Sequence, residues 1–436
     1  MRTSVEDEAV DLVRELIRID SVNTGDPATI GDGETRAARF VQAKLEEVGI
    51  ATTFVEPVPG RGSVVARMSG SDPDAEALIV HAHLDVVPVD AENWTHPPFG
   101  AEIHDGMLYG RGAVDMKDFA GVILAIARDL ARTDALPRRD LIFAFLADEE
   151  AGGTWGAKWL VENRPELFAG AGDAISEVGG FSVPILPDRR AYLLATAEKG
   201  VGHVGLTARG EAGHGSRPRP TDAVTRLAGA AARIGEHRFP VVRTRALDAF
   251  LRVVGEARGT EFTDDDLDAQ LEGLGFTGRL IQASARQTAA PTVLRAGGKF
   301  NVIPAAAHAE LDVRALPGGE DDLRAELTRL AGDDIDLDWD ISISPISSPV
   351  DAEFVGTISR ALVEEDPDGV VVPYLLPAST DNKHFAKLGV RGYGFVPLRV
   401  PDDFDVYGQF HAADERVPVD ALRFAARTTH RILTTA

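Results

Sequence analysis

The chain has 436 residues, an apolar fraction of 44%, and a formal net charge of −24 with a sequence pI near 4.8. This length exceeds the size at which a single hydrophobic core usually stops growing, which predicts two domains. So acidic a chain lacks the basic face that a nucleic-acid-binding protein needs, and the absence of cysteine excludes disulfides and thiolate metal ligands.

The first 68 residues predict two helices followed by two strands. Apolar residues recur with helical periodicity over residues 5–19 and 34–48, and the short runs 52–55 and 63–68 are typical of strands. The first helix has acidic residues where a signal peptide is basic, and no apolar run is long enough to span a membrane. We therefore expect a cytoplasmic protein.

Residues 78–83 form a continuous apolar strand that becomes polar at its end. Alternate side chains of a strand share a face, so His81, His83 and Asp85 can point the same way. Isolated polar groups in a buried strand cost several kcal/mol. A metal ion bound by His83, with Asp85 bonded to the other ring nitrogen, would satisfy the site. A pair of hydrogen-bonded core histidines is the alternative.

The next segment is expected to be a loop over residues 90–108, rich in proline and glycine. Asp115 then lies between a Gly-Arg-Gly sequence and an apolar helix expected at 119–130. Helix capping explains an acidic residue at this position, but it leaves the glycines unexplained, and these allow the backbone to approach another group closely.

Carboxylates follow the next two expected strands, at residues 140–146 and 174–176. Glu149 and Glu150 come after the first strand and Glu177 after the second. A solvated acidic turn is the alternative, but open α/β sheets place their sites at the carboxyl ends of strands. A dication there would turn the repulsion between these carboxylates into attraction.

Strands alternating with helices predict an α/β fold, a mostly parallel sheet covered by helices. From about residue 199 the expected order becomes βαββαβ, that of a ferredoxin-like α+β unit. We expect a catalytic domain formed by residues 1–198 and 348–436. An inserted lid or dimerisation domain would span 199–347, with an extra insertion at about 236–288.

The polar residues at the strand ends, together with a late histidine, form one inventory of nitrogen and oxygen ligands. Imidazole and carboxylate suit Zn²⁺, Co²⁺ or Mn²⁺, and this much acid suggests two ions bridged by one carboxylate. Two ions that share a water make a hydroxide available at neutral pH and polarise a carbonyl. A carboxylate that is not a ligand can pass the proton to a leaving amine. The candidate ligands are His83, Asp115, Glu150, Glu177 and His411, with Glu149 left over.

Five motifs resemble those of the M20 family of metallopeptidases, which includes aminoacylases, glutamate carboxypeptidase and several dipeptidases. They are His-Ala-His-Leu-Asp-Val-Val-Pro, Gly-Arg-Gly-Ala-Val-Asp-Met-Lys, Asp-Glu-Glu-Ala-Gly-Gly, Ser-Glu-Val-Gly-Gly and a late Phe-His. The resemblance covers essentially the whole chain. The segment 284–295 is most similar to the carboxypeptidase S and N-fatty-acyl-amino-acid hydrolase branch.

The resemblance implies a role for each matching residue of the candidate metal site. One metal would be held by His83 and Glu177 and the other by Glu150 and His411. Asp115 would bridge the two ions, Glu149 would be the general base, and Asp85 would orient His83. His81 matches no ligand.

The resemblance also implies substrate contacts from the inserted domain. His214 would reach the substrate carbonyl, and in dimeric family members this histidine comes from the partner subunit. Asn301 and Arg314 would bind the substrate carboxylate, a task that suits the forked guanidinium of arginine. A surface salt bridge is the alternative for Arg314.

These observations together predict a two-metal zinc amidohydrolase that releases an amino acid from an N-acyl amino acid or short peptide. The alternatives are a dipeptidase or carboxypeptidase acting on unblocked peptides and a non-catalytic metal-dependent binding protein. The non-catalytic binding protein is disfavoured because the candidate general base, Glu149, is present. We expect a small-molecule substrate and no nucleic-acid or membrane partner, and the sequence leaves open a homodimer through the inserted domain.

Overall fold

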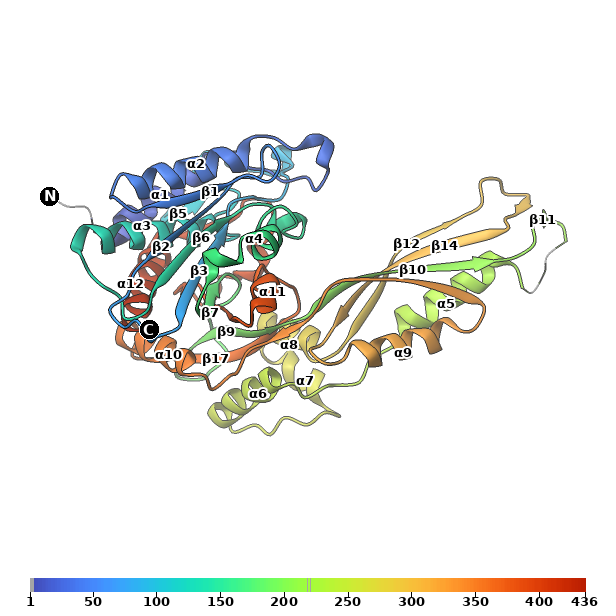
Figure 1. Ribbon diagram of the computed structural model, residues 1–436. Coiled ribbons are helices and arrows are strands. Elements are labelled where there is room, and N and C mark those ends of the chain that lie inside the picture. The colour runs from blue at the N-terminus through green and yellow to red at the C-terminus, as the bar shows by residue number, and fades with distance from the viewer. Residues whose placement is uncertain (1–3, 218, 220) are drawn as a thin grey trace.

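The computed structural model describes residues 4–217, 219 and 221–436, and its centre is a large mixed sheet (Figure 1). The strand order is β1-β2-β6-β3-β7-β18-β9-β16, with β8 and β17 also paired to β9. The neighbours β6, β3, β7 and β18 pair in parallel, as the sequence predicted for the sheet. The strands are β1 Thr52–Val55, β2 Ser63–Met68, β3 Ala77–His83, β6 Leu141–Leu146, β7 Ala171–Ser176, β8 Ser182–Val183, β9 Arg190–Glu198, β16 Ile346–Ser347, β17 Gly369–Leu376 and β18 Arg391–Gly394.

Helices cover both faces of this sheet, so its strands are apolar on both sides. In β3, Leu78 and Val80 belong to one hydrophobic core and Ile79 to another, as the alternation of side chains requires. The first core is closed by α1 Val5–Ile17, α2 Gly33–Glu46, α3 Lys117–Thr133, α10 Glu353–Glu365 and α12 Val419–Thr435, and the second by α4 Ala157–Asn163 and α11 Asn382–Phe385.

A second, four-stranded antiparallel sheet extends away from the large one (Figure 1). Its order, β12-β14-β10-β15, with α5 and α9 packed on it, is that of the ferredoxin-like unit expected from the sequence. A short two-stranded pair, β11 with β13, lies at its far end. The bounds are β10 Gly200–Arg209, β11 Gly213–His214, α5 Ala223–Glu236, β12 Thr288–Ala296, β13 Val302–Ile303, β14 Ala306–Ala315, α9 Glu320–Ala331 and β15 Ile335–Ile343.

Three helices that lie in sequence between α5 and β12 pack against the large sheet, not against the second one. They are α6 Arg245–Arg258, α7 Leu267–Glu272 and α8 Gly275–Ser284. Phe250 of α6 is fully buried in a core shared with Leu193 of β9 and Tyr374 of β17. The chain therefore returns from the second sheet to the first before it completes the second.

Three parts of the chain differ from the sequence-based expectation. The expected loop at 90–108 contains β4 Glu102–His104 and β5 Met107–Tyr109, a hairpin that pairs with β19 Arg416–Pro418. The strands β9 and β17 were not predicted. Pro373 lies within β17 and disfavours a central strand, but β17 pairs only with β9, so the missing N–H is tolerated.

Among the described helices, none combines the length and the apolar character that crossing a membrane requires.

Candidate metal centre

The polar residues expected at the strand ends meet at one edge of the large sheet. His83 ends β3, Glu177 follows β7, and Glu149 and Glu150 lie in a single 3₁₀ turn after β6. Asp115 precedes α3, and His411 lies in the loop before β19. Because the parallel strands β3, β6 and β7 end at the same edge, segments far apart in the sequence converge there.

Asp115 lies between the two histidines. His83 Nε2 lies 3.0 Å from Asp115 Oδ1 and 3.5 Å from Glu177 Oε2. His411 Nε2 lies 3.2 Å from Asp115 Oδ2 and 3.4 Å from Glu150 Oε2. The two carboxylate oxygens of Asp115 thus face two different imidazoles, each of which also faces a second carboxylate.

The pKa values of several groups in this cluster depart from their usual range. Burial, followed by the charge of Asp115, raises the pKa of Glu150 to about 7, and burial raises the pKa of Glu177 well above its usual range. Hydrogen bonds to Asp115 and Glu150 raise the pKa of His411 to about 10. Burial opposes protonation of His83, yet the charge of Glu177 and the hydrogen bond to Asp115 raise its pKa well above normal. A cation placed among these groups would relieve the competition for protons.

The donor set fits divalent metal ions. Ligand atoms of His83, Asp115 and Glu150 lie within 4.8 Å of one another, and the same holds for His83, Glu149 and Glu177. Glu150 Oε1 is buried and has no hydrogen-bond partner among the described residues. Such an atom is costly unless something binds it. Imidazole and carboxylate ligands are those that zinc and related ions prefer.

Asp115 is held by a carboxylate that the sequence did not single out. The helix α3 has Met116 at its N-cap, so capping by Asp115, the alternative considered above, is wrong. Glu415 is fully buried and accepts hydrogen bonds from the backbone N–H groups of Val114 at 2.7 Å and Asp115 at 3.1 Å. It also accepts one from the Arg111 guanidinium at 2.7 Å.

Asp85 mainly holds the turn that carries the two glutamates. Its carboxylate accepts hydrogen bonds from the backbone N–H groups of Glu149 at 3.1 Å and Glu150 at 3.0 Å. His83 Nδ1 lies 2.9 Å from the Asp85 backbone carbonyl and 3.5 Å from its carboxylate. Asp85 therefore contacts His83 as expected, but the closer of these two contacts is made by its backbone.

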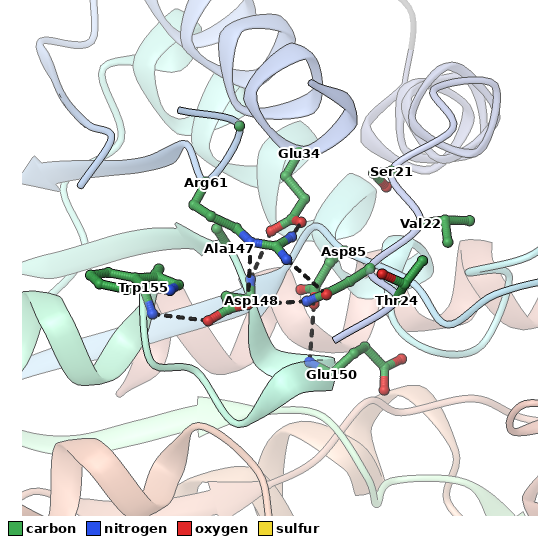
Figure 2. A network of polar contacts seen from close by, with 12 residues as sticks. Ser21, Val22, Thr24, Glu34, Arg61, Asp85, Ala147, Asp148, Glu150 and Trp155 are labelled. Atoms are coloured by element: carbon green, nitrogen blue, oxygen red, sulfur yellow. Dashed lines mark hydrogen bonds and ion pairs between the residues drawn. The ribbon is translucent and has the colours of Figure 1, made fainter. Parts of the chain in front are cut away.

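A buried polar network behind Asp85 fixes the same turn (Figure 2). Asn23 donates to Asp85 at 2.9 Å and to Asp148 at 3.2 Å. Arg61 forms ion pairs with Glu34 and Asp148, and all three side chains are at most 4% exposed. Asp148 also accepts the backbone N–H of Trp155 at 2.9 Å. Arg61 is thus the cation that balances the buried acids behind the turn.

Lys383 is a further residue that the sequence analysis missed. Its ammonium donates to Glu149 Oε1 at 3.2 Å, and the two side chains are 5% and 11% exposed. Glu149 therefore turns toward Lys383, whereas Glu150 turns toward His411. The only signal in the sequence was the Ser-Thr-Asp-Asn-Lys loop, and no periodicity indicates which residue such a loop presents. His81, which matched no ligand, bonds Asn382 at 3.0 Å.

The three expected substrate-binding residues lie outside the cluster. His214 belongs to β11, Asn301 to the turn before β13, and Arg314 to β14 of the second sheet. Among contacts of the described residues, none joins His214, Asn301 or Arg314 to the metal centre. His214 pairs with Val302 at the far end of the sheet, where Asn301 accepts the backbone N–H of Gly215 at 2.9 Å.

Arg314 lies at the opposite end of the same sheet. It pairs with Val201, next to the junction of β9 and β10, and its guanidinium binds Asp312 at 2.7 and 2.8 Å. The surface salt bridge considered as an alternative for Arg314 is therefore present. Burial and the charge of Arg314 lower the pKa of Lys199, the residue between β9 and β10, to about 7.

The sequence matches one protein family over most of its length. The profile of Peptidase family M20/M25/M40 matches residues 79–435. The "Probable carboxypeptidase S-like 2" of Dictyostelium discoideum is 30% identical, covering 82% of this chain and 71% of the relative. The human "N-fatty-acyl-amino acid synthase/hydrolase PM20D1" is 28% identical over 85% of this chain and 76% of its own length. Human "Aminoacylase-1" is 27% identical over 90% of this chain and 88% of its own length.

Solved structures of similar fold cover nearly the whole chain. An M20 family metallo-carboxypeptidase from Sulfolobus solfataricus superposes with a TM-score of 0.71 at 20% identity, covering 98% of this chain and 99% of the other. Human carnosine dipeptidase 1 superposes with a TM-score of 0.67 at 16% identity, covering 98% of this chain and 96% of the other. Both sheets therefore occur together in solved structures.

We predict that Arg61→Leu lowers the free energy of unfolding by about 3–5 kcal/mol, because it leaves Glu34 and Asp148 buried without their counter-ion. Urea denaturation measures this loss. Adding Glu34→Leu should recover part of the loss, since one unpaired charge is removed. Arg36→Leu is the matched control, because Arg36 pairs with Asp32 on the surface at 51% and 77% exposure, and such pairs contribute about 1 kcal/mol or less. Equal losses from Arg61→Leu and Arg36→Leu would contradict the prediction.

Proposed function

The chain belongs to peptidase family M20/M25/M40, hydrolases of peptide and amide bonds, and we propose that it is a two-zinc amidohydrolase that releases an amino acid from an N-acyl amino acid. The observation that carries this proposal is the cluster in which the buried Asp115 faces both the buried His83 and the more exposed His411. A carboxylate with one oxygen toward each imidazole is suited to bridging two ions.

The residues that would hold the ions divide into two sets that share Asp115. His83 and Glu177 form one set, and Glu150 and His411 form the other. Divalent ions bound there would polarise a substrate carbonyl and acidify a water molecule. The nitrogen and carboxylate ligands favour zinc, and cobalt or manganese would fit the same donors.

Glu149 is suited to act as the general base. Its carboxylate lies beside the cluster and is held by Lys383 at 3.2 Å, so it is oriented by a cation that is not a ligand. In this role Glu149 takes a proton from the attacking water and gives it to the leaving nitrogen of the amide. Asp85 contributes by fixing the backbone of the turn, so that Glu149 and Glu150 keep separate directions.

The substrate class is argued from the sequence relatives. Relatives at 27–28% identity that cover most of this chain are named for the hydrolysis of N-acyl amino acids. The second candidate is a carboxypeptidase or dipeptidase acting on unblocked peptides, favoured by the carboxypeptidase S-like relative. In either reaction, Arg314 would bind the substrate carboxylate by exchanging its present partner Asp312 for it.

The positions of His214 and Arg314 favour a dimer as the active form. They lie at opposite ends of a sheet whose strands β10 and β14 are ten residues long. Such strands span roughly 33 Å, which exceeds the length of a short acyl amino acid. We propose that His214 and Asn301 complete the site of a second copy of the chain, where His214 donates a hydrogen bond to the carbonyl oxygen as negative charge develops. The exposed apolar residues Leu294, Phe300 and Val302 near the same end of the sheet suit such an association.

A hydrolysis screen of the zinc-loaded protein tests the proposal. We expect release of free amino acid from N-acyl amino acids of different chain lengths at a higher kcat/KM than from dipeptides. Chelation should abolish the activity and Zn²⁺ or Co²⁺ should restore it. Full turnover by metal-free protein would overturn the two-metal mechanism, and faster cleavage of unblocked dipeptides would establish the second candidate.

Glu149→Gln should lower kcat by about 10²–10⁴-fold, the usual contribution of a general base, while the metal content stays that of the wild type. Glu150→Gln is the contrasting variant and should lose metal, because Glu150 is expected to be a ligand. Kinetics together with metal analysis of both proteins distinguish the two roles. Loss of metal from Glu149→Gln with retention in Glu150→Gln would mean that the two roles are exchanged.

His214→Ala should lower kcat by about 10²–10³-fold with unchanged metal content, since the lost hydrogen bond acts mainly in the transition state. Mixing inactive Glu149→Gln and His214→Ala proteins should restore partial activity, because a mixed dimer contains one site with both residues intact. Light scattering and subunit exchange establish that the mixed dimer forms. A proven mixed dimer without activity would place His214 in the site of its own chain.

A further inference from the structure

A second group of potential metal ligands lies outside the metal centre, on the β4–β5 hairpin and the segment before it. His96, Glu102 and His104 each offer one ligand atom, and these atoms all lie within 4.8 Å of one another. Their side chains are 23%, 45% and 43% exposed, so the group is accessible from solvent. None of the three belongs to the cluster around Asp115.

The local structure holds these side chains together. Glu102 and His104 are alternate residues of β4 and therefore share one face of the hairpin. His104 Nε2 lies 2.8 Å from Glu102 Oε2, and His96 Nδ1 lies 3.8 Å from the same oxygen. The rings of His96 and His104 stack with centroids 3.9 Å apart, and Tyr109 packs 4.4 Å from His96.

The hairpin is joined to the loop that carries His411. Thr95, next to His96, donates from its backbone N–H and its hydroxyl to the two oxygens of Asp414, both at 2.7 Å. Tyr109 of β5 pairs with Arg416 of β19. The segment 95–109 is thus fixed on both sides of the histidine pair, and rotation of one stacked ring about its side-chain bonds would direct both imidazoles toward a shared ion.

We propose that His96, Glu102 and His104 form an additional divalent metal site, selective for Zn²⁺ and similar transition metals and distinct from the metal centre. Two imidazoles and one carboxylate are a ligand set that zinc accepts, with the fourth position left to water. Two nitrogen ligands disfavour Mg²⁺ and Ca²⁺, which prefer oxygen. Because the site is open to solvent and has only three protein ligands, it fills at higher zinc concentrations than the buried cluster.

Zinc titration of the untagged, metal-loaded protein tests this proposal by isothermal calorimetry, followed by metal analysis. The double variant His96→Gln/His104→Gln should bind about one zinc ion per chain fewer than the wild type. His203→Gln is the matched control, because His203 is also exposed and lies 3.6 Å from one glutamate, Glu310, but has no second histidine beside it. Mg²⁺ and Ca²⁺ should give no corresponding binding event.

The test compares the number of zinc ions bound per chain by the variant and by the wild type. It is therefore independent of how many ions the metal centre holds. Hydrolytic activity of the double variant should equal that of the wild type at low zinc, which shows that the metal centre is intact. Glu102→Gln should weaken the additional binding event without changing activity. Equal zinc binding by wild type and double variant, or an equal loss in His203→Gln, would overturn the proposal.

Discussion

The concentration of buried negative charge at the carboxyl edge of the large sheet is the constraint on which the site depends. A buried carboxylate without a partner is costly, so each one needs a hydrogen-bond donor or a cation. Some of these carboxylates are bonded to backbone N–H groups or to arginine, and others contact imidazoles. Asp85 and Glu415 accept backbone N–H groups, and Asp148 accepts a backbone N–H and pairs with Arg61. Among the described residues, the carboxylates of Asp115 and Glu177 contact imidazoles and accept no backbone N–H group.

The buried acids therefore have two different roles. Some fix the backbone of the site, and others remain able to bind a ligand. The acids bonded to backbone N–H groups have little capacity left for a ligand, and they fix the position of the chain. Asp85 holds the turn at residues 149–150 and Glu415 holds the segment that presents Asp115. Because the backbone of the turn is fixed, neighbouring glutamates take different surroundings, with Glu149 beside Lys383 and Glu150 beside His411. Adjacent residues of the same type can therefore have different chemistry.

From the sequence, the polar residues at strand ends could be predicted, and so could Asp115 and His411, which lie in loops. His83, Glu149, Glu150 and Glu177 were found because each follows an apolar strand, and parallel strands end at one edge. Arg61 and Glu415 could not be found in the same way, because neither lies at a strand end. The extra insertion expected at about 236–288 forms helices α6–α8, but an amphipathic pattern shows only that a helix has an apolar face and not which sheet covers it.

The length of the second sheet limits how its residues can be used. Residues at its near end, such as Arg314, lie beside the junction with β9, whereas β11 and β13 lie a full strand length away (Figure 1). A sheet is stiff along its strands because consecutive backbone hydrogen bonds fix the register, so bending cannot bring β11 back to the metal centre. Rotation about the junction moves both ends together and keeps their separation. If a small substrate binds beside Arg314, as proposed, residues at the far end of the same chain stay a strand length away from it, which is why we propose that a second copy supplies them. The separation itself follows from the ten-residue strands β10 and β14.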